Sequence, residues 1–121
     1  MKNNQSKEDY LEAILLLAEE LDDVHQIEVA RKLGVSQPAV QKAMKILKGE
    51  GLIDTDGLHI CLTEAGRTYA GKVYHRHCTI REFLRYLGVN EADADSDACL
   101  MEHCVSEATF KAIEKFVNEN K

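Results

Sequence analysis

Residues 25–49 contain the pattern that most restricts the fold of this chain, because they predict two short helices joined by a sharp turn. Apolar residues recur at helical spacing in both halves: Ile27, Ala30 and Leu33, then Val40, Met44 and Leu47. Gly34 falls where the chain must turn, and Val35 is expected to plug the corner. Ser36 and Pro38 are suited to the first turn of the second helix. This spacing is typical of a helix-turn-helix, and an ordinary helical hairpin is the alternative.

Charge is unevenly distributed along the chain. The formal net charge of −6 by itself disfavours a nucleic-acid partner. Residues 31–48 nevertheless hold five basic residues and no acidic one, whereas residues 8–23 hold seven acidic residues and no basic one. A local basic element favours DNA binding more than the total charge opposes it. The expected DNA contacts are Ser36, Gln37, Pro38, Gln41, Lys42 and Lys45. Of these, Gln41 is expected to read a base edge and the lysines to contact phosphates.

Residues 52–62 predict a β-hairpin directly after the second helix of this pattern. Asp56-Gly57 is a two-residue turn signal, and residues 58–62 alternate apolar and polar side chains. A hairpin in this place is a wing. Its tip carries acidic residues, which repel phosphates. We therefore expect either a small contribution from the wing or weak binding to DNA.

The remaining segments predict helices, so the expected fold is mainly α. The first helix covers residues 7–21, with Ser6 as its N-cap. Three more helices are expected to begin after Thr63, Asn90 and Ser106. Gly88 is the expected stop of the first of these, and the second is expected to reach about Cys104. The predicted organisation is a winged helix-turn-helix DNA-binding domain at residues 1–63 and a helical metal-binding and dimerisation domain at residues 64–121.

The helices after residue 64 carry more apolar surface than one small lobe can bury. We therefore expect a homodimer, with Leu84, Leu87 and Phe110 as interface candidates. No apolar run approaches the roughly 18 residues of a membrane span, and the polar start of the chain does not resemble a signal peptide. A cytoplasmic protein with reduced cysteines and no membrane partner is expected.

The stretch CLMEHC at residues 99–104 brings a thiol, a carboxylate and an imidazole close together. On a helix, Cys99, Glu102 and His103 are i, i+3 and i+4 and share one face. These side chains are ligands that transition metals prefer. The alternative is that Cys99 packs as a small apolar residue beside a solvated Glu-His edge.

Five motifs, in order along the chain, resemble the metal-dependent transcriptional repressors of the diphtheria toxin repressor (DtxR) and manganese transport regulator (MntR) type. The motifs are EDYLEAILLL, VARKLGVSQPAVQKAMKILKGEGL, LTEAGRTYA, RHCTIREFLRYLGV and DACLMEHCVS. The resemblance implies a repressor of metal-uptake genes that binds a palindromic operator as a homodimer when a divalent metal is present. Mn(II) or Fe(II) is the implied metal, and Co(II) or Zn(II) are further possibilities. The chain ends before any third, SH3-like domain, as in the short manganese-type members.

The resemblance also implies the metal ligands: Asp9, Glu12, His77, Cys99, Glu102 and His103. Cys99 departs from the manganese type, which has Glu there. Iron-type members have Cys at that position but Met in place of Asp9, so the ligand set is a hybrid. Arg81 and Asp95 stand where the iron-type ancillary site has a Glu and a His.

Some of these residues, and the chain as a whole, also have alternative interpretations. Asp9 is also suited to capping the first helix, Glu12 to a solvated surface, and His77 to a satisfied interior position. A metal-independent winged-helix regulator is one rival. A thiol switch using Cys99 and Cys104 is another, although these residues lie about 140° apart around a helix, which is poor disulfide geometry. The sequence contains no HExxH motif, phosphate loop or Ser/His/Asp set. We therefore expect neither an enzyme nor a small organic substrate. Cys61, Cys78 and Cys104 are expected to be packing residues.

Overall fold

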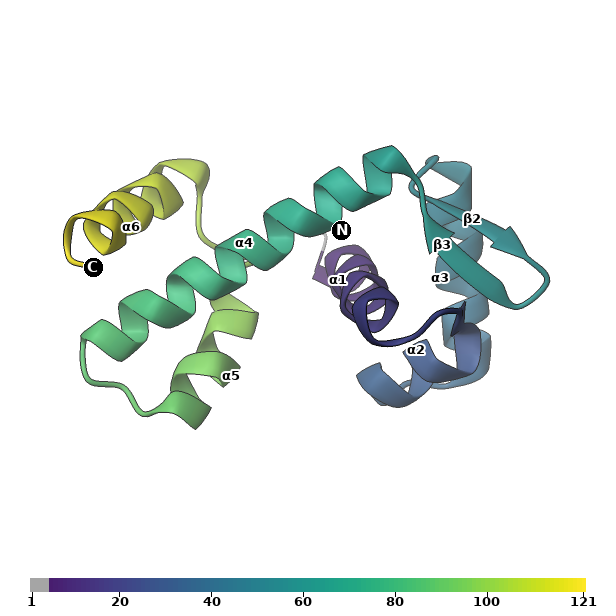
Figure 1. Ribbon diagram of the computed structural model, residues 1–121, viewed down its shortest axis with the longest axis horizontal. Helices are drawn as coiled ribbons and strands as arrows, with labels where there is room; N and C mark the ends of the chain where they lie inside the picture. The colour runs from purple at the N-terminus through teal and green to yellow at the C-terminus, as the bar shows by residue number, and fades with distance from the viewer. Residues whose placement is uncertain (1–4) are drawn as a thin grey trace. The chain divides into compact units, whose positions relative to one another are not determined.

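The computed structural model describes residues 5–121, which form six helices and three short strands (Figure 1). Their order is α1 Gln5–Glu20, β1 Val24–His25, α2 Gln26–Leu33, α3 Gln37–Gly49, β2 Ile53–Asp56, β3 His59–Leu62, α4 Glu64–Tyr86, α5 Glu91–Met101 and α6 Glu107–Glu119. The chain divides into two compact units within α4, between Gly71 and Lys72; we call them the N-terminal unit and the C-terminal unit. The domain boundary expected at residues 63 and 64 stays a prediction.

Helix α1 begins earlier than its sequence suggested. Ser6 lies inside the first turn and is not the N-cap, so that expectation was wrong. Gln5, Lys7 and Glu8 are all good helix formers, which extends the helix past Ser6 towards the N-terminus. Over residues 5–121, no helix has both the length and the apolar character needed to cross a bilayer.

The helix-turn-helix is confirmed. Gly34, between α2 and α3, has φ 67°, a left-handed conformation that favours glycine, and its N–H donates to the carbonyl of Ala30. The side chain of Ser36 caps α3, accepting a hydrogen bond from the Ala39 N–H at 3.2 Å. Val35 is 39% exposed, so it does not plug the corner as expected. The core of the N-terminal unit includes Leu11, Ile14, Val29, Ala30, Val40, Met44 and Leu47.

The wing belongs to a three-stranded antiparallel sheet with the order β1-β3-β2. Ile53 pairs with Leu62 and Asp56 pairs with His59, so the turn residues are Gly57 and Leu58, one position later than expected. Gly57 has φ 65° and takes the first turn position, where a type II′ turn requires glycine. The exposed side chain at the tip is Leu58, and the acidic residues belong to β2.

Hydrogen bonds join the start of α4 to the base of the wing. The Thr63 hydroxyl accepts a hydrogen bond from the Gly66 N–H at 3.0 Å and donates one to the Gly51 carbonyl at 2.7 Å. A Cβ on Gly66 would lie 1.9 Å from the carbonyl oxygen of Leu52. Only glycine therefore allows this close approach between α4 and the backbone just before β2.

The C-terminal unit contains the rest of α4 with α5 and α6, around a core of Ile80, Ala98 and Phe110. The helix stop at Gly88, with φ 97°, and the caps of Asn90 and Ser106 are confirmed. Phe110 is buried inside this unit, so its expected place on a dimer surface was wrong. Leu87, by contrast, is 59% exposed.

Candidate metal centre and nucleic-acid interface

His77 is the centre of a polar cluster in the C-terminal unit. It projects from α4, and its side chain is only 8% exposed. Its Nδ1 lies 2.8 Å from Oε1 of Glu102, and its Nε2 lies 2.9 Å from Oδ1 of Asp95. Both ring nitrogens therefore face carboxylates, an arrangement that a merely packed interior histidine does not need.

Cys99 joins the same cluster from α5. Its Sγ lies 3.7 Å from Nδ1 of His77. Ligand atoms of His77, Asp95 and Cys99 all lie within 4.8 Å of one another. Cys99 is exposed, which argues against the alternative that it is a core packing residue.

Glu102 and His103 follow α5 rather than lying on it, because the helix ends at Met101 and not near Cys104 as expected. The Glu102 N–H still donates to the Ala98 carbonyl at 2.9 Å, as in an α-helix. The His103 N–H instead donates to the Leu100 carbonyl at 3.4 Å, which is the tighter spacing of a 3₁₀ turn. The predicted shared helical face therefore includes Cys99 and Glu102 but not His103.

The carboxylate of Glu102 is the feature that best fits a cation. Its side chain is fully buried, and Oε2 accepts no hydrogen bond from the described residues. Nε2 of His103 lies 3.3 Å from Oε2. Buried carboxylate oxygens are normally hydrogen-bonded or bound to a metal. Imidazole, carboxylate and thiol groups in one place form a donor set suited to divalent first-row metals.

The pKa of His77 is raised to about 11 by its hydrogen bonds with Cys99 and Glu102, with a further contribution from Asp95. Burial acts in the opposite direction and is outweighed. The hydrogen bond from His77 in turn lowers the pKa of the Asp95 carboxyl. Without a metal, His77 is therefore held as imidazolium, and a metal must displace its proton.

Asp95 was not expected in this cluster. It stands where the iron-type ancillary site has a His. A usable signal was nevertheless present, since Asp95 and Cys99 are i and i+4 on α5 and must share one face.

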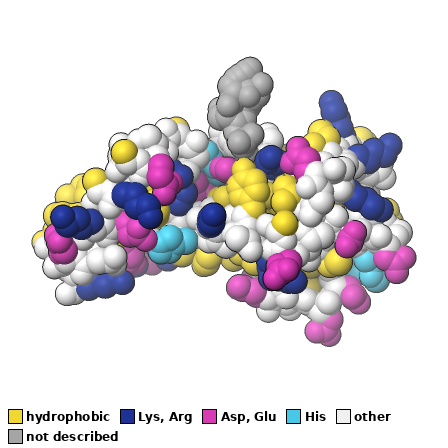
Figure 2. Space-filling view, turned by 90° about the horizontal axis from the view of Figure 1, so that it is seen from above, with side chains coloured by type: hydrophobic (Ala, Val, Ile, Leu, Met, Phe, Trp, Pro, Cys, Tyr) yellow, Lys and Arg dark blue, Asp and Glu magenta, His cyan; other side chains and the backbone are white. Residues whose placement is uncertain are grey.

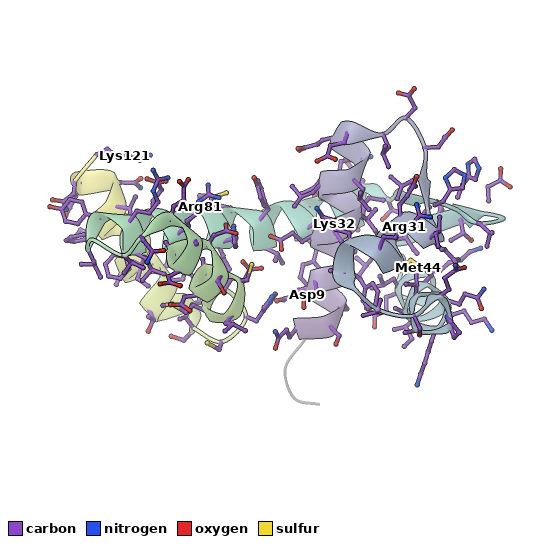
Figure 3. All side chains as sticks on the ribbon, turned by 90° about the horizontal axis from the view of Figure 1, so that it is seen from below. Asp9, Arg31, Lys32, Met44, Arg81 and Lys121 are labelled. Carbon is purple, nitrogen blue, oxygen red and sulfur yellow. The ribbon has the colours of Figure 1, made fainter. Side chains whose placement is uncertain are left out.

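Asp9 lies on α1, in the N-terminal unit (Figure 3). Glu12 follows three residues later on the same helical face. Asp9 is in the second turn of α1, so the alternative that it caps the helix is excluded. Glu12 is half-buried, unlike a fully solvated charge. Their part in metal binding stays a prediction.

Two expectations about the other cysteines were wrong. Cys61 and Cys104 are exposed, so neither is a core packing residue, and Cys78 is half-buried. His59 and His75 lie at the surface, the latter 2.6 Å from Glu114.

The residues predicted to contact DNA are all exposed, and all belong to α3 or its N-cap. In the part of the molecule that carries α2, α3 and the wing, Figure 2 shows several Lys and Arg side chains along one edge, with Asp and Glu side chains nearby. A small pocket beside α3 is lined by Gln26, Gln41, Met44, Lys45, Lys48 and Thr55. Nζ of Lys48 donates to the Thr55 hydroxyl at 3.0 Å. Base and phosphate contacts from α3 remain a prediction.

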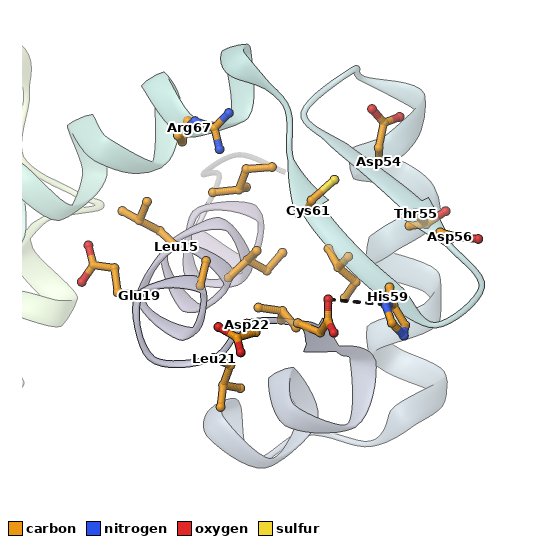
Figure 4. Close-up of a pocket in the computed structure, with 16 residues that line it drawn as sticks. Leu15, Glu19, Leu21, Asp22, Asp54, Thr55, Asp56, His59, Cys61 and Arg67 are labelled. Carbon is orange, nitrogen blue, oxygen red and sulfur yellow. Dashed lines mark ion pairs between the residues drawn. The ribbon is translucent and has the colours of Figure 1, made fainter.

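A larger groove of about 580 Å³ lies elsewhere in the N-terminal unit, between the end of α1, β1 and the wing (Figure 4). Its walls combine apolar side chains such as Leu15 with the carboxylates of Glu19, Asp22 and Asp54. Asp23 and His59, 3.8 Å apart, also border it. The residues of the His77 cluster take no part in this groove.

Comparison with known proteins identifies the family. Residues 4–58 match the N-terminal DNA binding domain of the iron dependent repressors, and residues 63–121 match their metal binding and dimerisation domain. The transcriptional regulator MntR of Escherichia coli O157:H7 is 39% identical over 114 residues, which cover 93% of this chain and 74% of the relative. The HTH-type transcriptional regulator MJ0568 of Methanocaldococcus jannaschii is 34% identical, and the match covers 98% of this chain and 97% of that one.

Solved structures agree with this result. The manganese regulator SloR matches with a TM-score of 0.81 and 34% identity, over 98% of this chain and 55% of that one. A manganese-dependent transcriptional repressor in complex with manganese matches with a TM-score of 0.84 and 30% identity, over 93% and 52%. This chain thus spans about half the length of these solved structures. It belongs to the iron-dependent repressor family, which contains MntR- and DtxR-type transcriptional regulators and not enzymes.

Proposed function

We propose that this chain is a metal-responsive repressor of metal-uptake genes that binds its operator when a divalent metal is bound. The observation that carries the proposal is the buried Glu102 carboxylate beside His77, Cys99 and His103. This cluster lies within residues 63–121, which match the family's metal binding and dimerisation domain. A metal-independent regulator has no use for such a donor set, and a thiol switch uses none of its carboxylates.

The proposed ligands are Asp9, Glu12, His77, Cys99, Glu102 and His103. Four of them are anionic when they bind a metal: Asp9, Glu12, Cys99 and Glu102. Gathering four anions without a cation is unfavourable, and a bound divalent ion supplies the compensating positive charge. Because the ligands come from α1 as well as from α4 and α5, metal binding is expected to favour one arrangement of the DNA-binding helices over others.

The proposed DNA partner is a palindromic double-stranded operator, bound by a homodimer in the cytoplasm. Ser36, Gln37, Pro38, Gln41, Lys42 and Lys45 are the proposed contact residues. Two copies of α3 held at a fixed spacing suit successive major grooves. The Ser36 hydroxyl already caps α3, so its contribution to DNA is expected to come from placing the helix N-terminus near a phosphate.

Mn(II) or Fe(II) is the proposed effector, with Co(II) and Zn(II) also accepted. Several similar proteins are named for manganese, and a similar structure, that of ScaR, contains bound zinc. The ligand set itself is expected to accept several metal ions, since carboxylates favour Mn(II) whereas the Cys99 thiolate favours softer and later ions.

The test is fluorescence anisotropy of a labelled duplex from upstream of the protein's own gene. The protein is titrated anaerobically with chelator, and then with Mn(II), Fe(II), Co(II) or Zn(II). Tighter operator binding with at least one metal supports the proposal, and Glu102→Gln should remove that gain while Asp97→Asn, an exposed change on α5, should not. Equal affinity with chelator and with every metal would favour the metal-independent alternative.

A further inference from the structure

We propose that Asp95 is a positioning residue for the metal centre: by accepting the Nε2–H of His77, it directs Nδ1 towards Cys99 and Glu102 as the metal-binding nitrogen. This inference rests on the proposed metal-responsive function. It assigns Asp95 a role outside the ligand set and fixes which nitrogen of His77 holds the metal.

The two nitrogens of His77 have different surroundings. Nδ1 faces two of the proposed ligands, Glu102 Oε1 at 2.8 Å and Cys99 Sγ at 3.7 Å. Nε2 lies 2.9 Å from Asp95 Oδ1. A metal bound at Nδ1 therefore has a carboxylate and a thiolate within reach, while Nε2 keeps its proton and its hydrogen bond.

The Asp95 carboxylate also interacts with a second residue, Arg81. Arg81, one helical turn after His77 on α4, places NH1 3.5 Å from the same Oδ1 atom of Asp95. The guanidinium is a permanent cation. Its presence beside Asp95 disfavours a metal ion on the Nε2 side of the imidazole, where like charges would meet.

A carboxylate in this place acts through the histidine. Metal-binding histidines usually donate their second N–H to a carboxylate or carbonyl, which fixes the tautomer and the ring orientation and makes the ligating nitrogen more basic. Losing such a partner typically lowers metal affinity by 10- to 100-fold. Asp95 has the geometry for this role, and its 53% exposed side chain is not needed for the core.

The experiment measures Zn(II) and Co(II) affinity by competition with a chromophoric chelator, using the full chain. Asp95→Ala should bind about 10- to 100-fold more weakly than wild type. Asp95→Asn keeps an oxygen that accepts the Nε2–H and should lie between the two. Asp97→Asn, two residues along α5, removes the same charge but lies on another face of the helix and should bind like wild type.

A second readout separates positioning from general stability. Histidine-selective ¹⁵N NMR of the Zn(II)-loaded wild type should show His77 with a metal-bound Nδ1 and a protonated Nε2. If Nε2 carries the metal, Asp95 is a ligand and the inference is overturned. If wild type binds metal and Asp95→Ala binds as tightly, the inference fails while the proposed function stands. If wild type binds no metal, it is the proposed function that fails.

Discussion

Cys99 is the residue that separates this centre from one built only of carboxylates and imidazoles. Its exposed Sγ lies beside His77 Nδ1, where a thiolate and a metal can meet. We predict that Co(II) gives a thiolate-to-metal charge-transfer band in the near ultraviolet, and that Cys99→Ser abolishes it. Cys104→Ser is the control, because the Cys104 thiol instead donates to the Met101 carbonyl. Co(II) binding without such a band would remove Cys99 from the ligand set.

The same residue should set metal preference. Affinity for N, O and S ligands already rises from Mn(II) through Fe(II) to Co(II), and a thiolate strengthens that trend. Cys99→Glu creates the manganese-type ligand set and should move the metal response of operator binding towards Mn(II). The anisotropy titration with each metal measures this shift.

His77 should make the stability of the metal-free protein depend on pH. Its pKa is about 11 in the folded chain, against an ordinary value of 6.5. A raised pKa contributes stability that is fully present below pH 6.5 and is lost as the pH rises through 11. We predict that wild type is more stable than His77→Gln at pH 7 and that the difference shrinks towards pH 10. Urea unfolding with chelator present measures both, and a difference that does not change with pH would contradict the prediction.

At the scale of secondary-structure elements, α4 contains two glycines with opposite roles. A Cβ on Gly66 would collide with the Leu52 carbonyl, whereas one on Gly71 meets nothing within 4 Å. We predict that Gly66→Ala destabilises the protein by about 1–3 kcal/mol or more, because backbone must move. Gly71→Ala should instead stabilise it by about 0.5–1 kcal/mol through helix propensity. Urea unfolding of both variants tests the pair, and equal effects would refute the close approach.

On helix α3, some residues should contribute to overall DNA affinity and another to discrimination between sequences. Lys42→Ala and Lys45→Ala should weaken binding to any duplex and lower the slope of log affinity against log salt by about 1 each. Gln41→Ala should reduce discrimination between operator and random DNA. If all three variants weaken both duplexes alike, Gln41 does not read a base.

Much of this element structure could be predicted because it depends on local chemistry. Ser36, Asn90 and Ser106 cap their helices through their own side chains, and Gly34 takes a conformation that few other residues adopt. Strand β1 was missed, since it has only two residues and pairs with a strand more than 30 residues away. The wing turn was misplaced by one residue because Asp56-Gly57 and Gly57-Leu58 both contain the required glycine.

The metal centre was less predictable than the helices. Spacing predicted one helical face for Cys99, Glu102 and His103, although α5 ends at Met101. It could not place His77 beside Cys99 and Glu102. Nor could it indicate which ring nitrogen faces which carboxylate, because that depends on how α4 and α5 pack. Asp95 was overlooked for the same reason, although its i to i+4 relation with Cys99 was visible in the sequence.

At the scale of the whole molecule, a repressor of this kind needs two copies of α3 to read a palindrome. Residues 63–121 match a dimerisation domain, and within them Tyr86, Leu87 and Leu100 leave large apolar side chains exposed in the single chain. Exposed apolar surface of this kind marks an interaction site. The N-terminal unit has a comparable side chain in Leu58, at the tip of the wing.

We therefore predict that the metal-free protein sediments as a dimer at micromolar concentration and that Leu87→Glu shifts it towards monomer. Leu58→Glu introduces the same charge at a residue of similar exposure, 57% against 59%, and should leave the dimer intact. Operator affinity should fall in Leu87→Glu even with metal present, because one copy of α3 reads only half of a palindrome. A monomeric wild type would refute the dimer. A dimeric Leu87→Glu would place the interface on other residues, and an effect of Leu58→Glu would move it to the wing.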